Sequence, residues 1–232
     1  MVWRILFERQ IKKLQEAACS EFLEGLDRIS FQPEKIPDFN ITNSILEGLT
    51  GWKIQAVPGI VDDRYFFELL ARREFPATTW IRRMDQLEYL EEPDMFHDVF
   101  AHVPLLTNKD FCEFLQSLGE LALVNAHDDF AIHLISRMYW FTVEFGLINE
   151  TKGKRIYGAG ILSSSGETDF SLGDKPFHLE YNVDHILDSS YRKDIFQSKY
   201  FIINTFEELF KSLPLLRNGL EVRLSGNQER IR

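Results

Sequence analysis

The chain has 232 residues, of which 44% are hydrophobic, and a formal net charge of −10 at pH 7. This length and hydrophobic content predict a soluble globular protein that can bury a substantial core. The negative charge argues against nucleic acid or an anionic membrane surface as a partner, because both require a basic face. No apolar run approaches the roughly 18 residues of a membrane span. A small-molecule partner fits this composition better.

Two features indicate a reducing compartment. Cys19 and Cys112 stand far apart and lack the CxxC spacing of a redox or metal motif. From Met1 the chain leads straight into an amphipathic segment, without the apolar core of a signal peptide. We therefore expect a cytoplasmic protein whose cysteines are packing residues.

The first part of the chain predicts helices and one short strand. Helical periodicity runs over residues 2–26, and Pro33 and Pro37 then break the chain into a loop. Asp62 or Asp63 is suited to cap a later helix. The expected elements are helices at residues 2–26, 40–50 and 64–73 and a strand at residues 52–57.

The remainder of the chain predicts mainly helices. Residues 154–169 indicate turn and strand, because Gly158 and Gly160 would hold this segment close to another part of the chain. Taken together, the expected helices and strands indicate a mainly α fold with small β elements. They form a single domain over residues 1–232 without an internal repeat or linker. The other expected elements are helices at residues 93–101, 110–125, 130–145 and 206–213 and a strand at residues 200–203.

Three side chains in the middle of the sequence point to a metal site. His97 and His102 stand close together, and Glu144 follows in an apolar and aromatic run. Two imidazoles and one carboxylate can occupy one face of an octahedron and leave three positions open, as in the facial triad of non-heme Fe(II) oxygenases. Burying the Glu144 carboxylate without a cation would cost several kcal/mol. The three residues therefore predict an iron enzyme.

The spacing of the two histidines constrains the helix that carries them. Five residues of an intact α-helix turn about 140° beyond one full turn, so the rings of His97 and His102 would point to different sides. The helix must therefore end or loosen between them, and Pro104 predicts a break at Val103. We expect Asp98 or a carbonyl of the broken turn to fix which nitrogen of His97 faces the metal.

This pattern leaves other classes open. A His-x4-His pair is by itself a weak signal, because spacing alone does not fix geometry. A 2-oxoglutarate oxygenase, a hydrolase with a different metal, or a non-catalytic binding protein could carry the same three residues. Anaerobic addition of iron would separate an enzyme from a degenerate binder, which should bind no stoichiometric Fe(II).

Sequence blocks around these residues resemble the signature blocks of the pterin-dependent aromatic amino acid hydroxylases. The similarity runs from about Trp3 to Leu224 and is greatest for the bacterial phenylalanine 4-hydroxylases. It implies the single-domain catalytic fold of that family without a regulatory or tetramerisation domain, and therefore a monomer. The blocks are residues 93–98, 102–106, 139–147 and 157–164, together with Trp52, residues 56–59 and 75–82, Tyr89 and Leu90.

The resemblance implies a reaction and its cofactors. Members of the family use one Fe(II), tetrahydrobiopterin or a related tetrahydropterin, and O2 as co-substrate to hydroxylate the ring of an aromatic amino acid. The catalytic metal ligands carry over to His97, His102 and Glu144. L-Phenylalanine, converted to L-tyrosine in phenylalanine catabolism, is the expected substrate, since tryptophan hydroxylases tend to carry phenylalanine where Trp140 stands. A tryptophan or tyrosine hydroxylase, or a non-catalytic pterin- or metal-binding relative, is the alternative.

The resemblance also implies two binding sites. Phe66 would stack on the pterin, although one ring of the aromatic run around it is expected in the core. Arg82 would hold the amino-acid carboxylate through two parallel hydrogen bonds. The implied pterin residues are Gly59, Val61, Asp63, Phe66, Asp98 and Tyr139. The implied amino-acid residues are Arg82, Pro93, Trp140, Ser163 and Ser164, and the positions of the two serines also imply support of an iron-ligand histidine.

Three positions carry more than one interpretation. Asp98 stands where animal members have glutamate, so its shorter reach favours a water bridge to the pterin. Ser164 fits a turn cap as well as a substrate contact. Lys193 matches none of the family's patterns at a position that varies with substrate preference, and its role stays open.

Overall fold

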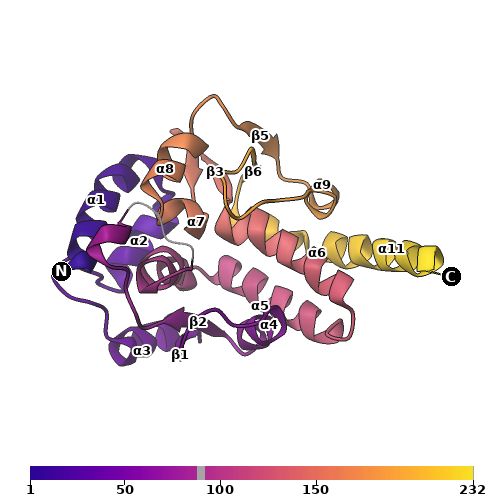
Figure 1. The fold of residues 1–232 in the computed structure, drawn as a ribbon, viewed down its shortest axis with the longest axis horizontal. Helices are drawn as coiled ribbons and strands as arrows, with labels where there is room; N and C mark the ends of the chain where they lie inside the picture. Colours follow the sequence, from indigo (N-terminus) through magenta and orange to yellow (C-terminus); the bar gives the residue numbers. More distant parts are fainter. Residues whose placement is uncertain (88–91, 232) are drawn as a thin grey trace.

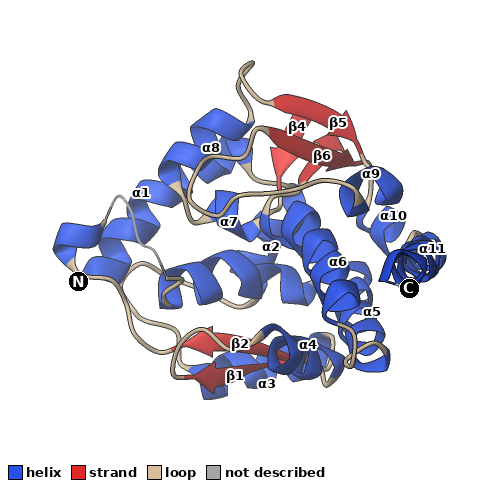
Figure 2. Ribbon diagram, turned by 45° about the vertical axis from the view of Figure 1, so that its right-hand side comes forward, coloured by secondary structure: helices blue, strands red, loops and turns tan. Residues whose placement is uncertain are grey.

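The protein is built mainly of helices, with two small β-sheets on opposite sides of a helical centre (Figure 1 and Figure 2). The computed structural model describes residues 1–87 and 92–231, so Tyr89 and Leu90 lie outside it. The mainly α architecture expected from the sequence is confirmed. The helices are α1 (Val2–Ala17), α2 (Ser20–Arg28), α3 (Phe39–Leu49), α4 (Asp63–Ala71), α5 (Lys109–Val124), α6 (Asp129–Tyr139), α7 (Ala159–Leu162), α8 (Ser165–Ser171), α9 (Val183–Leu187), α10 (Phe206–Lys211) and α11 (Leu213–Ile231).

Four shorter helical segments depart from α-geometry. Two are π-helical and carry the expected metal ligands, and two are 3-10 turns. The π-helical segments are η2 (Phe96–His102) and η4 (Trp140–Glu144), and the 3-10 segments are η1 (Met84–Gln86) and η3 (Val103–Thr107).

The smaller sheet places one end of both its strands beside a cavity. Strands β1 (Lys53–Val57) and β2 (Glu74–Thr78) run parallel, with α4 as their connection. In a parallel pair the carboxyl ends meet at one edge, and Val57 pairs there with Thr78. Asp62 caps α4, as expected, since its side chain accepts hydrogen bonds from the backbone of the first turn.

The larger sheet covers the other side of the helical centre. Its strand order is β4-β3-β6-β5, with β3 and β4 antiparallel and the other neighbours parallel. The sequence predicted the β6 strand but not β3 or β5. The strands are β3 (Leu147–Glu150), β4 (Gly153–Ile156), β5 (Phe177–Glu180) and β6 (Lys199–Ile203).

The N-terminal helix predicted over residues 2–26 is two helices. The chain leaves α1 at Ala18, pairs with Ile156 in an isolated parallel bridge, and begins α2 after Cys19. The Cys19 amide donates to the Ile156 carbonyl at 2.9 Å. The hydrophobic spacing continues through this break, so the periodicity did not reveal it. Tertiary pairing with β4 overrides the local helical preference here.

The prediction of turn and strand for residues 154–169 is wrong beyond Ile156. Residues 159–171 form α7 and α8. The close approach expected of the glycines does occur, because a Cβ on Gly158 would lie 2.4 Å from the Glu144 carbonyl oxygen. Gly158 begins α7, and this contact places α7 directly against η4.

The hydrophobic core holds η2 from behind. The rings of Phe96 and Phe100 stack with centroids 4.6 Å apart, and Trp3 meets Phe96 edge-on at 5.7 Å. All three side chains are buried. Among the described residues, no helix has the length and hydrophobicity required to cross a bilayer. The packing fixes one face of η2 and leaves the opposite face to the site described next.

Candidate metal centre

The π-helical segment η2 brings the two histidines to one side. A π-helix closes hydrogen bonds between residues five apart, so such residues return to the same face. His97 and His102 have this separation, and the expected loosening of the helix is therefore present. The expected break at Val103 is wrong, because Val103 keeps a right-handed helical conformation (φ −63°, ψ −35°) and the chain continues into η3.

A second π-helical segment presents Glu144. In η4 the Phe145 amide donates to the Trp140 carbonyl at 3.0 Å, a bond that spans five residues. Tyr139 and Glu144 have the same separation and line the same cavity. The helix expected over residues 130–145 thus ends as an α-helix at Tyr139. Both halves of the candidate centre depend on a local widening of the helix.

The three predicted ligands converge. The Nε2 atoms of His97 and His102 lie 3.2 Å apart, the His102 Nε2 lies 3.2 Å from Glu144 Oε1, and the His97 Nε2 lies 3.6 Å from Glu144 Oε2. Metal–nitrogen bonds of about 2.1 Å at right angles would separate neighbouring donors by about 3 Å. Within the described residues, these three form the cluster whose donor atoms could hold one metal ion. The donor set fits an octahedral ion with one face taken by protein.

Ser163 fixes the orientation of the His97 ring. The Ser163 hydroxyl donates to the Ala159 carbonyl at 2.9 Å and lies 2.8 Å from His97 Nδ1. Because its single proton is used on the carbonyl, the serine accepts from Nδ1, and the Nε2 lone pair faces the cluster. The expectation that Asp98 would do this is wrong, since the Asp98 Oδ2 atom accepts from the amide and hydroxyl of Thr78 at 2.8 and 2.9 Å.

Charge and burial favour the ionised form of Glu144 and the neutral form of His97. Burial would raise the pKa of Glu144, but the charges of His102 and His97 outweigh it and lower the pKa to about 2. Burial lowers the pKa of His97. An ionised carboxylate and a neutral imidazole are the forms that bind a metal.

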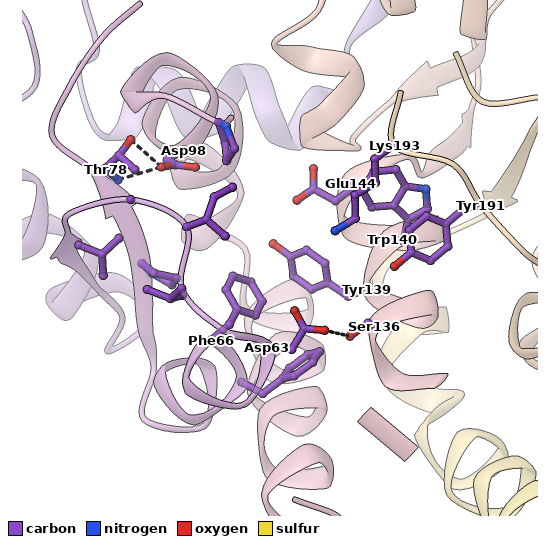
Figure 3. Close-up of a pocket in the computed structure, with 17 residues that line it drawn as sticks. Asp63, Phe66, Thr78, Asp98, Ser136, Tyr139, Trp140, Glu144, Tyr191 and Lys193 are labelled. Atoms are coloured by element: carbon purple, nitrogen blue, oxygen red, sulfur yellow. Dashed lines mark hydrogen bonds between the residues drawn. The ribbon is translucent and has the colours of Figure 1, made fainter. Parts of the chain in front are cut away.

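All six residues expected at the pterin line one cavity (Figure 3). Figure 3 shows Phe66, Thr78 and Asp98 on one side of this cavity and Trp140 on the other. Phe66 is half-buried, lines the cavity and meets Tyr139 edge-on at 5.0 Å. The six residues are Gly59, Val61, Asp63, Phe66, Asp98 and Tyr139.

All five residues expected at the amino acid line a second cavity, which shares Glu144 with the first. Ser164 also caps α8, since its hydroxyl accepts from the Glu167 amide at 3.3 Å. Both of its interpretations are therefore compatible with its position. The five residues are Arg82, Pro93, Trp140, Ser163 and Ser164.

The Arg82 guanidinium is already held on one edge. Its Nε and Nη2 atoms each lie 2.8 Å from an oxygen of Asp94, whose side chain is fully buried. Burial would raise the pKa of Asp94, but Arg82 outweighs it and lowers that pKa. A guanidinium has a second edge, between Nη1 and Nη2, which can still receive a carboxylate in the two-bond mode. Asp94 thus aims Arg82 at the cavity.

Several site residues were not predicted. The sequence offered one signal for Asp94, which lies three residues before His97 and accepts from its amide at 3.2 Å. Tyr191 stacks on Trp140 with ring centroids 4.5 Å apart, and Gln197 accepts from the Trp140 indole at 3.1 Å. Their distance along the chain left no local pattern to detect. Lys193 lines both cavities, with its Nζ 5.9 Å from the centre of the Trp140 ring.

The chain is similar to known phenylalanine hydroxylases over most of its length. Phenylalanine-4-hydroxylase of Chromobacterium violaceum is 48% identical over 209 residues, which cover 90% of this chain and 70% of that protein. The Pseudomonas aeruginosa protein of the same name is 42% identical over 210 residues, which cover 90% of this chain and 79% of that one.

Solved structures agree with this similarity. The crystal structure of the Chromobacterium violaceum enzyme with bound iron(III) and oxidised 7,8-dihydrobiopterin matches with a TM-score of 0.91 at 46% identity, covering 97% of this chain and 81% of that chain. The family model for biopterin-dependent aromatic amino acid hydroxylases matches residues 1–222. This chain belongs to the biopterin-dependent aromatic amino acid hydroxylase family.

Proposed function

We propose that the protein is an iron- and tetrahydropterin-dependent monooxygenase that converts L-phenylalanine to L-tyrosine. The observation that carries the proposal is the meeting of two cavities at Glu144. One cavity has the residues expected for a pterin and the other those expected for an amino acid. A metal held by His97, His102 and Glu144 would lie between both ligands. Relatives named phenylalanine-4-hydroxylase at 42% to 48% identity support this choice.

The protein residues hold and orient the reactants in this proposal. Iron, pterin and O2 together supply the oxygen activation when bound. Phe66 offers a ring face to the pterin, and Asp98 is held by Thr78 on the same side of the pterin cavity, across from Trp140. Arg82, aimed by Asp94, binds the amino-acid carboxylate and so sets how far the ring reaches toward the metal.

Trp140 supports phenylalanine rather than tryptophan as the substrate. Its indole lines both cavities, stacks with one face on the Tyr191 ring, and donates from its edge to the Gln197 side chain. A large ring fixed in this place narrows the amino-acid cavity. We expect Trp140→Phe to relax selectivity toward tryptophan, and to let pterin oxidation run ahead of hydroxylated product because the substrate ring is held less closely.

We further propose that the protein acts as a monomer in the cytoplasm, with the described residues forming one catalytic domain. The cysteines Cys19 and Cys112 are buried and unpaired, which suits a reducing compartment. Light scattering at several protein concentrations tests the monomer, and a concentration-dependent mass would contradict it.

Product analysis with three amino acids tests the proposed reaction. Purified protein is loaded with Fe(II) under anaerobic conditions and then given O2, a tetrahydropterin and phenylalanine, tyrosine or tryptophan in parallel. We expect tyrosine from phenylalanine at the highest rate, in proportion to pterin oxidised. A failure to bind stoichiometric Fe(II) would favour a non-catalytic relative. Faster hydroxylation of tryptophan or tyrosine would overturn the substrate, and turnover with 2-oxoglutarate in place of pterin would overturn the cofactor.

A further inference from the structure

Glu167 is a buried carboxylate that the metal centre does not use. It lies on α8, has 4% of its surface exposed, and borders the amino-acid cavity. Its Oε1 atom accepts from the Gln197 amide at 3.0 Å and from the Tyr200 hydroxyl. A carboxylate in this environment is costly to desolvate unless its hydrogen bonds compensate. The two donors come from one segment that runs from residue 197 into β6.

Gln197 continues the connection to the site. Its own side chain joins three groups, because Oε1 accepts from the Trp140 indole at 3.1 Å while Nε2 donates to the carbonyls of Arg192 and Ile195 at 2.8 and 3.1 Å. The residue is 5% exposed. One amide thus closes the turn over residues 192–197 and fixes the edge of the indole.

The same segment supplies the face of the indole. Tyr191 stacks on Trp140 at an interplanar angle of 18°, and Figure 3 shows both rings beside Lys193 at the edge of the cavity. Lys193, Ile195 and Phe196 are exposed. Within this segment, Tyr191, Lys193 and Gln197 contact Trp140. The backbone amide of Gln197 is in turn held by the Glu167 carboxylate.

We propose that Glu167 is a positioning residue for the amino-acid cavity, which fixes residues 191–197 and, through Gln197, the indole of Trp140. The role of the cavity as amino-acid site rests on the proposed function, whereas the effect on Trp140 does not. The hydrogen bonds that Glu167 accepts are of the charge-assisted kind when the carboxylate is ionised, and these are the stronger and shorter ones. Burial raises the pKa of Glu167. Either form of the carboxyl group keeps an oxygen able to accept from both donors.

Two substitutions separate a positioning role from simple packing. Glu167→Gln keeps a side-chain oxygen that can accept from the Gln197 amide and the Tyr200 hydroxyl. Glu167→Leu fills a similar volume and removes the acceptor. Tyr181→Phe is the matched control, because it removes a hydroxyl that lies 2.7 Å from Ser212 Oγ, outside both cavities.

The first readout is the fluorescence of Trp140 in metal-free protein. The chain has four tryptophans, so the Trp140 signal is taken as the difference between each variant and the same variant with Trp140→Phe. We expect Glu167→Leu to shift this difference spectrum to longer wavelength and to make the Trp140 indole more accessible to a soluble quencher. Glu167→Gln and Tyr181→Phe should keep the wild-type spectrum.

The second readout is the split between KM and kcat in the iron-loaded enzyme. We expect Glu167→Leu to lower kcat/KM for the amino acid by about tenfold to a hundredfold, because displacements on the order of 1 Å can cost this much. The pterin KM and the iron content should stay at wild-type values. Glu167→Gln should restore most of the loss.

The outcomes distinguish the two proposals. If Glu167→Leu keeps the wild-type Trp140 spectrum and amino-acid KM, or if Glu167→Gln is as impaired as Glu167→Leu, the positioning role is wrong. If wild-type protein makes no hydroxylated product, the proposed function fails, and the fluorescence still decides the inference. Should Glu167→Leu fail to fold, Gln197→Met removes the next connection with Glu167 intact. It must then alter the Trp140 spectrum, and an unchanged spectrum overturns the inference.

Discussion

The two walls of the site are built in opposite ways. The donor wall consists of η2 and η4 with Asp94 and Ser163, and its three metal donors stand on two π-helical segments, with the Ser163 hydroxyl fixing the His97 ring. The loop wall consists of residues 191–197, of which 192–196 are exposed, and it meets the site mainly through the half-buried Tyr191 and the buried Gln197. The metal donors are thus positioned by the backbones of two short helical segments. Substrate fit depends on contacts between distant segments, which can change without disturbing the metal donors.

The largest effect should follow loss of a donor. His97→Ala, His102→Ala and Glu144→Ala should each lose most bound iron and bring hydroxylation to background, because one fewer ligand destroys the facial arrangement. Metal analysis and product formation measure this. His133→Ala is a matched control, since His133 lies on α6 and its Nε2 is 3.3 Å from Arg137 Nε, away from the donors. Wild-type turnover with full iron content in any of the three variants would contradict the metal centre.

The next effect should come from Arg82, which joins the donor wall to the substrate. Arg82→Lys replaces the guanidinium fork with a point charge and disturbs both the Asp94 pair and the proposed contact to the substrate carboxylate. We expect a rise in amino-acid KM equivalent to roughly 2–5 kcal/mol, together with lower stability. Steady-state kinetics and denaturant unfolding separate the two losses.

Arg83 provides the control for this experiment. Its side chain is 75% exposed, against 9% for Arg82, and it pairs with Asp85. Arg83→Lys should therefore leave the amino-acid KM unchanged. If instead Arg82→Lys keeps its KM and Arg83→Lys raises it, the carboxylate contact belongs to Arg83.

A smaller effect should separate the neighbouring serines. Ser163→Ala removes the acceptor of the His97 ring, and loss of such a partner typically lowers metal affinity by about tenfold to a hundredfold. Ser164→Ala removes the α8 cap and should cost about 1 kcal/mol of stability, with unchanged iron affinity. Competition with a chelator and thermal unfolding give the two quantities. Equal iron affinity in both variants would show that Ser163 does not orient His97.

How well the sequence predicts a contact of this site depends on how far apart its two residues lie along the chain. The metal donors could be identified because they stand in short blocks of characteristic composition. The spacing of His97 and His102 predicted that the helix loosens at η2 without specifying its π-helical form, whereas no pattern in the sequence predicted the widening at η4. The local pattern offered the neighbour Asp98 as the partner of His97, and only the family resemblance pointed to the serines, because Ser163 lies 66 residues away. The contact between Trp140 and Gln197 spans 57 residues and is decided by tertiary packing.

The smallest expected effect concerns Glu167, which holds the loop wall, and the pH dependence of the free energy of unfolding. Because burial raises the pKa of Glu167 in the folded protein, the folded state binds this proton more tightly than the unfolded state. The resulting stabilisation is complete below the ordinary pKa of glutamate and is lost as the pH rises through the folded pKa. The glutamine of Glu167→Gln does not ionise, so this variant should not lose stability at position 167 as the pH rises.

We therefore expect Glu167→Gln to gain stability relative to wild type as the pH rises from 4 to 7, by an amount on the order of 1 kcal/mol, similar to one net hydrogen bond. Denaturant unfolding of both proteins at a series of pH values measures this difference. If the difference between Glu167→Gln and wild type is constant with pH, Glu167 does not titrate with a raised pKa. In that case the donors around it offset its burial, and the loop wall is anchored by an ionised carboxylate throughout this range.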